Sequence, residues 1–384
     1  MQHYDYIITG MGCAGLSLAC HLIESDLIKG KTVLLLDKAP KIENDRTWCS
    51  WQQEVGIFET IVRHKWNKVN FYGENFQQVL DIQPYTYKMI RGIDFYNYAY
   101  ECIAAHRNIH IVYTDVLKVQ SEPTGAIVNT TNATYTADYV FNSIQFQKFD
   151  TEGKYNFIQH FKGWEIQAQE SVFNPQVATL MDFRVPQLQN DITFVYVLPT
   201  TPNTAFIEYT IFSKQLLEQH EYDEALKDYI HTYIGIKDYT IKHIEFGTIP
   251  MTNAEFPDYG KHIINIGVAG AAIKPSTGYG FTMIQRQCQA IVEQLKQNNT
   301  PYFKNYAAQF KYSLYDNTLF NVLENRKPTG KTIFTDMFKH NPADRVLRFL
   351  DNDTTIIEEI KIMNSVPIQF FLPAAIKELF RKLF

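Results

Sequence analysis

Residues 4–15 read YDYIITGMGCAG, and this stretch decides the fold. The apolar run at 6–8 predicts a short buried strand, and the apolar spacing in 16–23 predicts a helix that starts directly after the glycines. A G-x-G-x-x-G turn between such a strand and such a helix is typical of dinucleotide-binding proteins. The sequence therefore predicts a Rossmann-like βα unit in this part of the chain.

The three glycines of the turn have separate roles. Gly10 permits the tight turn, Gly12 lets the backbone approach a pyrophosphate, and Gly15 lets the helix pack on the strand. Cys13 and Ala14 lie in the turn between Gly12 and Gly15, and the helix that follows directs its N-terminus at the phosphates. We predict that all five residues bind the cofactor.

An acidic residue is expected about 20 residues beyond such a turn, at the end of the next strand, where it binds the ribose hydroxyls. Residues 33–37 read VLLLD, so the prediction gives this role to Asp37. Strand, glycines, helix, second strand and terminal acid together indicate an adenine dinucleotide. Their spacing does not separate FAD from NAD.

The composition narrows the class of protein. A chain of 384 residues with 45% hydrophobic residues is long enough for a large two-part α/β protein, and its net charge of −5 indicates neither disorder nor nucleic-acid binding. The five cysteines are scattered without metal-ligand spacing, which is typical of a reducing compartment and of a protein without a structural metal. We find no signal peptide and no apolar run long enough to span a bilayer, so we expect a cytoplasmic protein.

Residues 45–51 read DRTWCSW and fit neither a helical nor an alternating period. Loops at the carboxyl ends of the strands line the cofactor crevice in doubly wound sheets, which favours a place for Arg46 beside the cofactor. The alternative is a surface arginine next to two tryptophans of the core.

A second strand, glycine-rich loop and helix follow one another in residues 262–295. This segment resembles the late flavin motif of the aromatic-hydroxylase-like flavoproteins, in which a Gly-Asp pair ends the strand and the next helix directs its N-terminus at the flavin. Here Val268 follows Gly267, so the aspartate is missing. A helix starting near Gly278 still places positive partial charge beside a flavin and favours its anionic reduced form, so we prefer FAD to NAD. The predicted cofactor-binding residues of this segment are Gly267, Gly270, Pro275, Gly278 and Tyr279.

The order of predicted strands and helices indicates interleaved domains. We expect a discontinuous, Rossmann-like FAD-binding domain formed by residues 1–65, 91–150 and 256–298. An antiparallel β-sheet domain that binds the substrate is expected from 66–90 and 151–255. Residues 299–384 are expected to form a C-terminal helical segment.

Eight short motifs, in order along the chain, give a more specific resemblance. They are the turn at 5–15, DRTWC at 45–49, FKGW at 161–164, MDFR at 181–184, YVLP at 196–199, FIEYT at 206–210, GTIPM at 247–251 and PSTGY at 275–279. With this set the chain resembles the carotenoid lycopene cyclases over nearly its full length. The resemblance implies a bacterial lycopene β-cyclase activity, in which a peripheral membrane flavoprotein closes the ψ-ends of lycopene into β-ionone rings, through γ-carotene to β-carotene, without net redox change.

The resemblance also implies a catalytic residue. In that family the Glu of an Ile-Glu-x-Thr motif is the catalytic acid, and the matching residue is Glu208. One position departs from the pattern, because the residue before the Pro of the Pro-x-Thr-Gly-Tyr motif is often His in relatives and is Lys274 here. We therefore assign no proton role to this position.

The chemistry of ring closure sets its own requirements. A carboxyl group donates a proton to an alkene at neutral pH only where burial raises its pKa. Phe206 and Glu208 share one strand face, where an aromatic ring stabilises a cation. From the residues alone, the alternative is an edge-strand glutamate that faces water. A reduced, anionic flavin, with NAD(P)H as its reductant, adds fixed negative charge near the cation.

Two other functions use the same features. A flavin-dependent monooxygenase or a prenyl-lipid reductase would have the same scaffold and would consume reductant in each turnover. A non-catalytic carotenoid- or flavin-binding module would bind these ligands without forming rings.

Residues 374–384 have the pattern of an amphipathic helix. Ile376, Leu379, Phe380 and Leu383 recur at helical spacing, and basic residues predominate on the other face. Such a helix is suited to lie on an anionic bilayer, which predicts peripheral association with the inner face of the cell membrane, where a carotenoid is collected. The alternative is a terminal helix that docks its apolar face on the protein.

Overall fold

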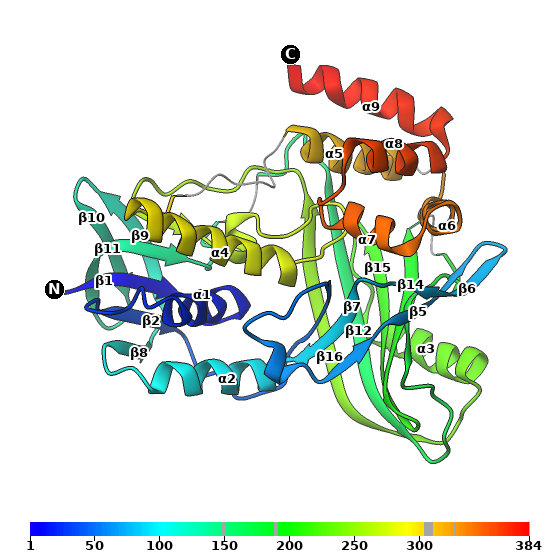
Figure 1. Ribbon diagram of the computed structural model, residues 1–384, viewed down its shortest axis with the longest axis horizontal. Helices are drawn as coiled ribbons and strands as arrows, with labels where there is room; N and C mark the ends of the chain where they lie inside the picture. The colour runs from blue at the N-terminus through cyan, green and yellow to red at the C-terminus, as the bar shows by residue number, and fades with distance from the viewer. Residues whose placement is uncertain (148–149, 188–190, 303–309, 326–327, 384) are drawn as a thin grey trace.

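A computed structural model describes residues 1–147, 150–187, 191–302, 310–325 and 328–383. These residues form two seven-stranded sheets, a three-stranded sheet and a group of helices at the C-terminal end of the chain (Figure 1). The fold is mixed α/β, as predicted.

The first sheet contains the predicted dinucleotide-binding strands in the order β8-β2-β1-β11-β10-β9, and β17 pairs with β11. The pairs between β8, β2, β1, β11 and β17 are parallel. The strand β10 pairs antiparallel with β9 on one side and with β11 on the other. The strands are β1 (Gln2–Thr9), β2 (Val33–Asp37), β8 (Ile109–Tyr113), β9 (Val116–Glu122), β10 (Gly125–Thr130), β11 (Thr134–Asn142) and β17 (Ile263–Asn265). The antiparallel strands do not form a separate layer, because one strand, β11, pairs with both β10 and β1.

Each face of this sheet packs on a different partner. Tyr6, Ile8 and Leu35 lie in the cluster formed with α1 (Cys13–Glu24), α2 (Gly92–Ala104) and α4 (Phe281–Asn298). Ile7 and Leu34 point to the other face and pack with residues of β9 and β10. This alternation explains why β1 and β2 read as nearly continuous apolar runs, since both of their faces are buried.

The second sheet has the order β16-β12-β15-β14-β13-β5-β6 and is antiparallel except for the parallel pair β13 and β5. Its strands are β5 (Lys68–Gly73), β6 (Phe76–Asp81), β12 (Asn156–Ala168), β13 (Val177–Asp182), β14 (Ile192–Thr201), β15 (Thr204–Ser213) and β16 (Tyr239–Thr252). The hairpins expected in 66–90 divide between two sheets. In the small sheet, β7 (Thr86–Arg91) pairs with β3 (Thr47–Gln52) and β4 (His64–Trp66), and a short 3-10 helix, Glu59–Ile61, precedes β4.

Helices cover the two faces of the second sheet. On one face, α3 (Gln219–Tyr229) and the π-helical turn Ile230–Ile234 pack on Trp164, Val197 and Ile207. On the other face, Phe194 and Phe212 belong to the large cluster shared with the C-terminal helices. These helices are α5 (Phe310–Glu324), α6 (Gly330–His340), α7 (Ala343–Leu350), α8 (Ile356–Ser365) and α9 (Ile368–Leu383). Glu208 lies two residues after Phe206 on β15, so both side chains point to the same face of the sheet, which is the face away from α3.

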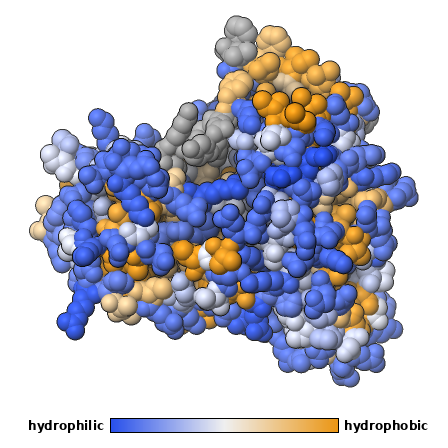
Figure 2. Space-filling view, in the orientation of Figure 1, coloured by the Kyte–Doolittle hydropathy of each residue, from blue (hydrophilic) through white to orange (hydrophobic). Residues whose placement is uncertain are grey.

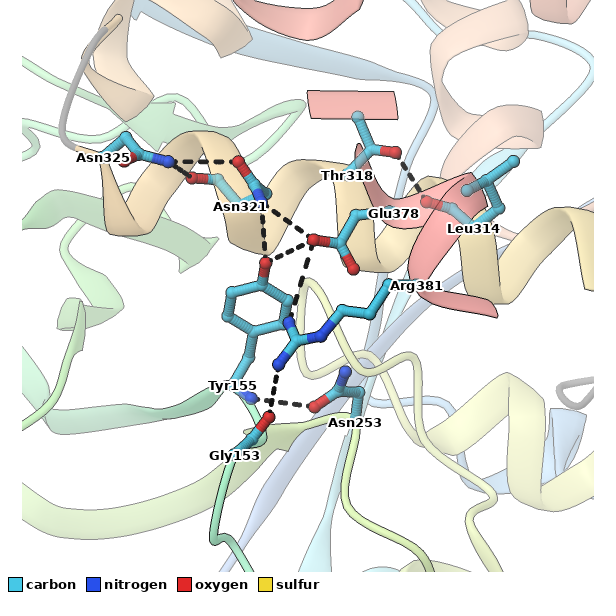
Figure 3. A network of polar contacts seen from close by, with 9 residues as sticks. All are labelled: Gly153, Tyr155, Asn253, Leu314, Thr318, Asn321, Asn325, Glu378 and Arg381. Carbon is cyan, nitrogen blue, oxygen red and sulfur yellow. Dashed lines mark hydrogen bonds and ion pairs between the residues drawn. The ribbon is translucent and has the colours of Figure 1, made fainter. Parts of the chain in front are cut away.

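The C-terminal helix docks on the protein through a side that contains Phe371, Ala374 and Glu378. It begins at Ile368, earlier than predicted, and its buried Glu378 accepts hydrogen bonds from Tyr155 Oη at 2.6 Å and Asn321 Nδ2 at 2.8 Å (Figure 3). Ile376 and Phe380 remain 48% and 58% exposed. The helix therefore docks on the protein, while Ile376 and Phe380 of the predicted apolar stripe face away from the contact. Phe384, the last residue of the predicted helix, lies outside the described residues.

Candidate active site

A cavity of about 630 Å³ lies where the glycine turn of the first sheet, the small sheet and the second sheet meet. It brings together residues that are far apart in sequence. Among those that line it are Gly12, Cys13, Arg46, Trp48, Cys49, Tyr87, Phe161, Tyr196, Phe206, Glu208, Glu245, Gly247, Val268, Gly278, Tyr279 and Phe281.

The first glycine turn has the local geometry that the sequence predicts. Gly10 has a positive φ of 87°, and a Cβ there would lie 2.2 Å from Ser143 Oγ. A Cβ on Gly15 would lie 2.0 Å from the carbonyl oxygen of Gly10. Gly12 differs, because no heavy atom lies within 4 Å of its Cβ position, and α1 has no side-chain cap. The turn therefore presents open space and uncapped N–H groups to the cavity, which fits a bound pyrophosphate.

Asp37 lies at the end of β2, beside this turn. Its Oδ2 accepts a hydrogen bond of 2.6 Å from the backbone N–H of Met11, and Lys41 Nζ lies 3.7 Å from its Oδ1. The buried carboxylate thus holds the glycine turn against β2. Its contact with a ribose stays a prediction.

The second glycine-rich segment lies directly against the first. Gly267, with φ of 63°, begins a 3-10 helix, Gly267–Gly270, and a Cβ on Gly267 would lie 2.6 Å from Ala14 Cβ. Val268, which replaces the aspartate of the flavin motif, is 37% exposed and lines the cavity. Gly270 instead packs against the backbone of Asn265, where an added Cβ would lie 2.1 Å from the carbonyl oxygen.

Helix α4 begins at the cavity wall. Gly278 has a positive φ of 73°, and the helix starts at Phe281 without a side-chain cap. Gly278, Tyr279 and Phe281 all line the cavity, whereas Pro275 lines a neighbouring one. The uncapped N-terminus places partial positive charge on this wall, as the sequence predicted for a flavin site.

Both interpretations of the DRTWCSW segment describe part of the structure. Arg46 is exposed, lines the cavity and donates a hydrogen bond of 3.4 Å to the carbonyl oxygen of Phe246. Trp48 packs edge-on against Phe95 with ring centroids 5.1 Å apart. Trp51 is buried. The segment thus supplies a cationic group to the cavity from a strand that the tryptophans anchor in the core.

The second sheet forms the opposite wall of the cavity. In its register, Glu208 of β15 and Glu245 of β16 are both paired with Gly163 of β12, which runs between them. Tyr196 of β14 is paired with Glu208 on the other side. The two carboxyl groups therefore stand in one row across the sheet and project from the same face.

Aromatic rings fill the places where glycine leaves this wall without a side chain. A Cβ on Gly163 would lie 2.2 Å from Phe206 Cζ, and a Cβ on Gly247 would lie 2.3 Å from Phe161 Cζ. The ring of Phe206 thus covers the position between the two glutamates. The glycines of the FKGW and EFGT runs are required by this close approach, which is one reason for glycine inside a strand.

The environment of each glutamate raises its pKa. Glu208 is partly exposed, but only to the cavity, and it accepts a hydrogen bond of 2.8 Å from Thr210 Oγ1. Burial raises the pKa of Glu208 to about 8, and the charge of Glu245 acts in the same direction. Glu245 is 2% exposed, its Oε1 accepts a hydrogen bond of 3.0 Å from the backbone N–H of Thr47, and burial raises its pKa to about 7.

Glu245 was not predicted from the sequence. The sequence offered one indication of this residue. Glu245 lies two residues before Gly247 of the GTIPM motif and therefore points to the same face of the strand. Its burial, however, depends on β3, which is almost 200 residues away in the chain and supplies the Thr47 N–H group.

Lys274 belongs to a buried ion-pair cluster outside this cavity. Its Nζ lies 2.8 Å from Asp316 Oδ1 and 2.8 Å from Asn352 Oδ1. Ser276 Oγ donates to the same Asp316 oxygen. The residue that departs from the family pattern therefore holds the 274–279 turn against α5.

The arrangement of sheets and helices is that of the aromatic-hydroxylase-like flavoproteins. One similar solved structure is a geranylgeranyl bacteriochlorophyll reductase-like protein from Thermoplasma acidophilum, with 15% identity, coverage of 99% of each chain and a TM-score of 0.64. Another is p-nitrophenol 4-monooxygenase from Pseudomonas putida, with 14% identity, 97% and 99% coverage and a TM-score of 0.62. A variant of the halogenase PltM in complex with FAD has 13% identity, 96% and 85% coverage and a TM-score of 0.57.

The sequence itself gives the family. The family described as "Lycopene cyclase protein" matches residues 5–375, so the chain belongs to the lycopene cyclase family. The resemblance found in the motifs is thereby confirmed. A comparison with curated protein sequences gives no match.

Proposed function

We propose that this protein is a lycopene β-cyclase that closes the ψ-ends of lycopene into β-ionone rings by acid catalysis, without net redox change. The observation that carries this proposal is the row of Glu208 and Glu245 on one wall of an aromatic cavity, in a chain of the lycopene cyclase family. The reaction is an isomerisation, so it needs one group that gives a proton and one that takes a proton back.

Glu208 is the proton donor in this proposal. A pKa of about 8 keeps its carboxyl group protonated at neutral pH, and the cavity holds an apolar chain end beside it. The proton goes to the terminal double bond and leaves a tertiary cation. The neighbouring alkene attacks that cation, which forms the ring bond and moves the positive charge into the ring.

Phe206 and Glu245 act in the second half of the reaction, and the proton then returns from Glu245 to Glu208 before the next turnover. The ring of Phe206, which lies over Gly163 between the two glutamates, stabilises the cation through its face. Glu245 takes the proton that leaves the ring carbon when the new double bond forms. The hydrogen bond from the Thr47 N–H group and the charge of Arg46 both lower the pKa of Glu245 against the effect of burial, which favours its ionised form.

FAD is the cofactor that this cavity fits best. Gly12 and the uncapped start of α1 suit its pyrophosphate, and Arg46, Gly278, Tyr279 and the start of α4 suit its flavin end. We propose that residues which shape or contact the cofactor site also include Gly10, Cys13, Ala14, Gly15, Asp37 and Gly267. Gly270 and Pro275 line the neighbouring cavity and support the site from that side. When bound and reduced by NAD(P)H, the flavin supplies fixed negative charge near the cation.

The protein collects its substrate from a membrane in this proposal. No helix in the described ranges is long and apolar enough to cross a bilayer. The α8–α9 surface, however, is apolar and exposed (Figure 2). We define it by the residues Ile356, Ile357, Ile360, Ile368, Leu372, Ile376 and Phe380, whose exposed fractions run from 48% to 69%. Exposed Lys361 and Lys377 lie on the same helices and suit an anionic bilayer, such as the inner face of the cell membrane.

The test is a stoichiometric assay. The purified protein, loaded with FAD and reduced once under anaerobic conditions, is incubated with lycopene in detergent micelles, and the pigments are separated. Cyclisation requires many rings per flavin without further reductant. Consumption of reducing equivalents with each product, or hydroxylated or hydrogenated products, would indicate a monooxygenase or a prenyl-lipid reductase instead. Bound lycopene that is never converted would indicate a binding module.

A further inference from the structure

A second cavity, of about 350 Å³, lies among the C-terminal helices and contains none of the residues assigned above to catalysis. Helices α5 to α9 enclose it, and aliphatic, phenylalanine and methionine side chains form most of its wall. Its volume lies within the range of small-molecule sites, which is about 300–1,000 Å³. It is therefore large enough for part of an apolar ligand.

The outer end of this cavity opens on the α8–α9 surface. Met363, Ile368 and Leu372 line the cavity and are also 36%, 54% and 55% exposed. An apolar chain that leaves a bilayer at this surface thus meets an apolar mouth rather than a polar rim.

The inner end of the cavity is the turn that also borders the Glu208 cavity. Ser276 and Thr277 line the apolar cavity, and the next two residues, Gly278 and Tyr279, line the other one. The turn is closed on itself by a hydrogen bond from Lys274 N–H to the Tyr279 carbonyl oxygen at 2.9 Å. A single turn of chain therefore separates the two cavities.

The charged groups at the inner end are already paired. Lys274 and Asp316 both line the cavity, are 4% and 5% exposed in their side chains, and lie 2.8 Å apart. Thr277 Oγ1 is buried and has no hydrogen-bond partner in the parts of the chain that the structure describes. This end offers no unpaired charge to a ligand, which favours a neutral hydrocarbon over a fatty acid or a phospholipid head group.

We propose that this cavity binds the isoprenoid chain of the carotenoid where it enters from the α8–α9 surface, on the other side of the 274–279 turn from the Glu208 cavity. The proposal rests on the proposed function, because only one end of a long polyene fits beside Glu208 and the cofactor, and the remaining chain needs apolar surroundings. It assigns substrate binding to Leu319, Met337 and Ala375, which no part of the catalytic argument uses.

Filling the cavity tests this assignment. The Glu208→Gln variant is incubated with lycopene in detergent micelles, and bound pigment per chain is measured after gel filtration across a range of lycopene concentrations. Adding Ala375→Trp, on the half-buried side of α9, fills the cavity, and we expect the apparent Kd for lycopene to rise on the order of tenfold, as for the loss of about two buried methylene groups. Gln369→Trp adds the same side chain at an exposed position of α9 that does not line the cavity, and it leaves the Kd unchanged.

A second variant guards against a folding defect. Leu372→Glu places a charge at the exposed mouth without entering the core, and it also weakens binding, with the melting temperature as the check on folding. An unchanged Kd in both folded variants overturns the proposal. The proposal is also overturned if Ala375→Trp removes co-purified acyl lipid, measured by mass spectrometry, but leaves lycopene binding intact. If wild-type protein binds lycopene through this cavity and forms no rings, the proposed function fails while this site stands.

Discussion

Glu208 and Glu245 project from strands that do not touch each other, yet both are in register with Gly163 of the strand between them. The two carboxyl groups therefore face one cavity from positions two strands apart, and the ring of Phe206 lies over the glycine between them. In the proposed reaction, this row of an acid, an aromatic ring and a second acid serves as proton donor, cation support and proton acceptor.

Glu208→Gln removes the proton donor and keeps the size of the side chain. We expect the rate of β-ring formation to fall by about 10²–10⁴-fold, the usual contribution of a positioned general acid. The FAD content, measured by absorbance after gel filtration, stays at the wild-type level. Glu170→Gln changes an exposed glutamate outside the cavity and serves as the control. Turnover near the wild-type rate in Glu208→Gln would remove this residue from the mechanism.

The two pKa values predict a bell-shaped dependence of rate on pH. Glu208 must be protonated, and this form is lost as the pH rises through about 8. Glu245 must be ionised, and this form is lost as the pH falls through about 7. The rate of ring formation is therefore greatest between these values. In Glu245→Gln the remaining activity loses its acidic limb, and the position of the ring double bond is expected to change. A wild-type rate that keeps rising above the pKa of Glu208 would contradict the assignment.

Gly163→Ala tests the contact between the glycine and the ring. The new Cβ would lie 2.2 Å from Phe206 Cζ, so the ring has to move, and we expect the free energy of unfolding in urea to fall by about 1–3 kcal/mol. The smaller side chain in Gly163→Ala/Phe206→Leu recovers part of that loss. Gly56→Ala, where no atom lies within 4 Å of the added Cβ, is the control. If Gly163→Ala were as stable as wild type, the ring of Phe206 would not lie over residue 163.

Sequence reasoning reached the parts of the site that depend on local chain geometry. The glycine turn at Gly10–Gly15 follows from residues within one turn, whereas Glu208 was indicated by the resemblance to the lycopene cyclases. Glu245 was missed because its burial depends on Thr47, on a strand of another sheet. The sequence did not predict that α9 docks around Glu378, because the partners of this residue, Tyr155 and Asn321, are distant in sequence. Long-range pairing of polar groups leaves no periodic signal.

Lys274→Met tests whether this position is structural. The change leaves Asp316 buried without its cation, and we expect the free energy of unfolding to fall by about 3–5 kcal/mol. Lys274→Met/Asp316→Leu regains most of that stability, since no charge is then left buried alone. Lys296→Met, at the exposed end of α4, has no such effect. A stable single variant with a strongly altered pH profile would instead give Lys274 a role in proton transfer.

The docking of α9 around Glu378 leaves Ile376 and Phe380 exposed, and this predicts how the protein meets a membrane. Ile376→Gln/Phe380→Gln replaces two exposed apolar side chains, so the melting temperature stays the same while binding to anionic vesicles weakens by about tenfold or more. Val79→Gln, an equally exposed apolar position on β6, leaves vesicle binding unchanged. In detergent micelles, where no bilayer has to be reached, the double variant cyclises lycopene at the wild-type rate. Full vesicle binding by the folded double variant would place the membrane contact elsewhere on the molecule.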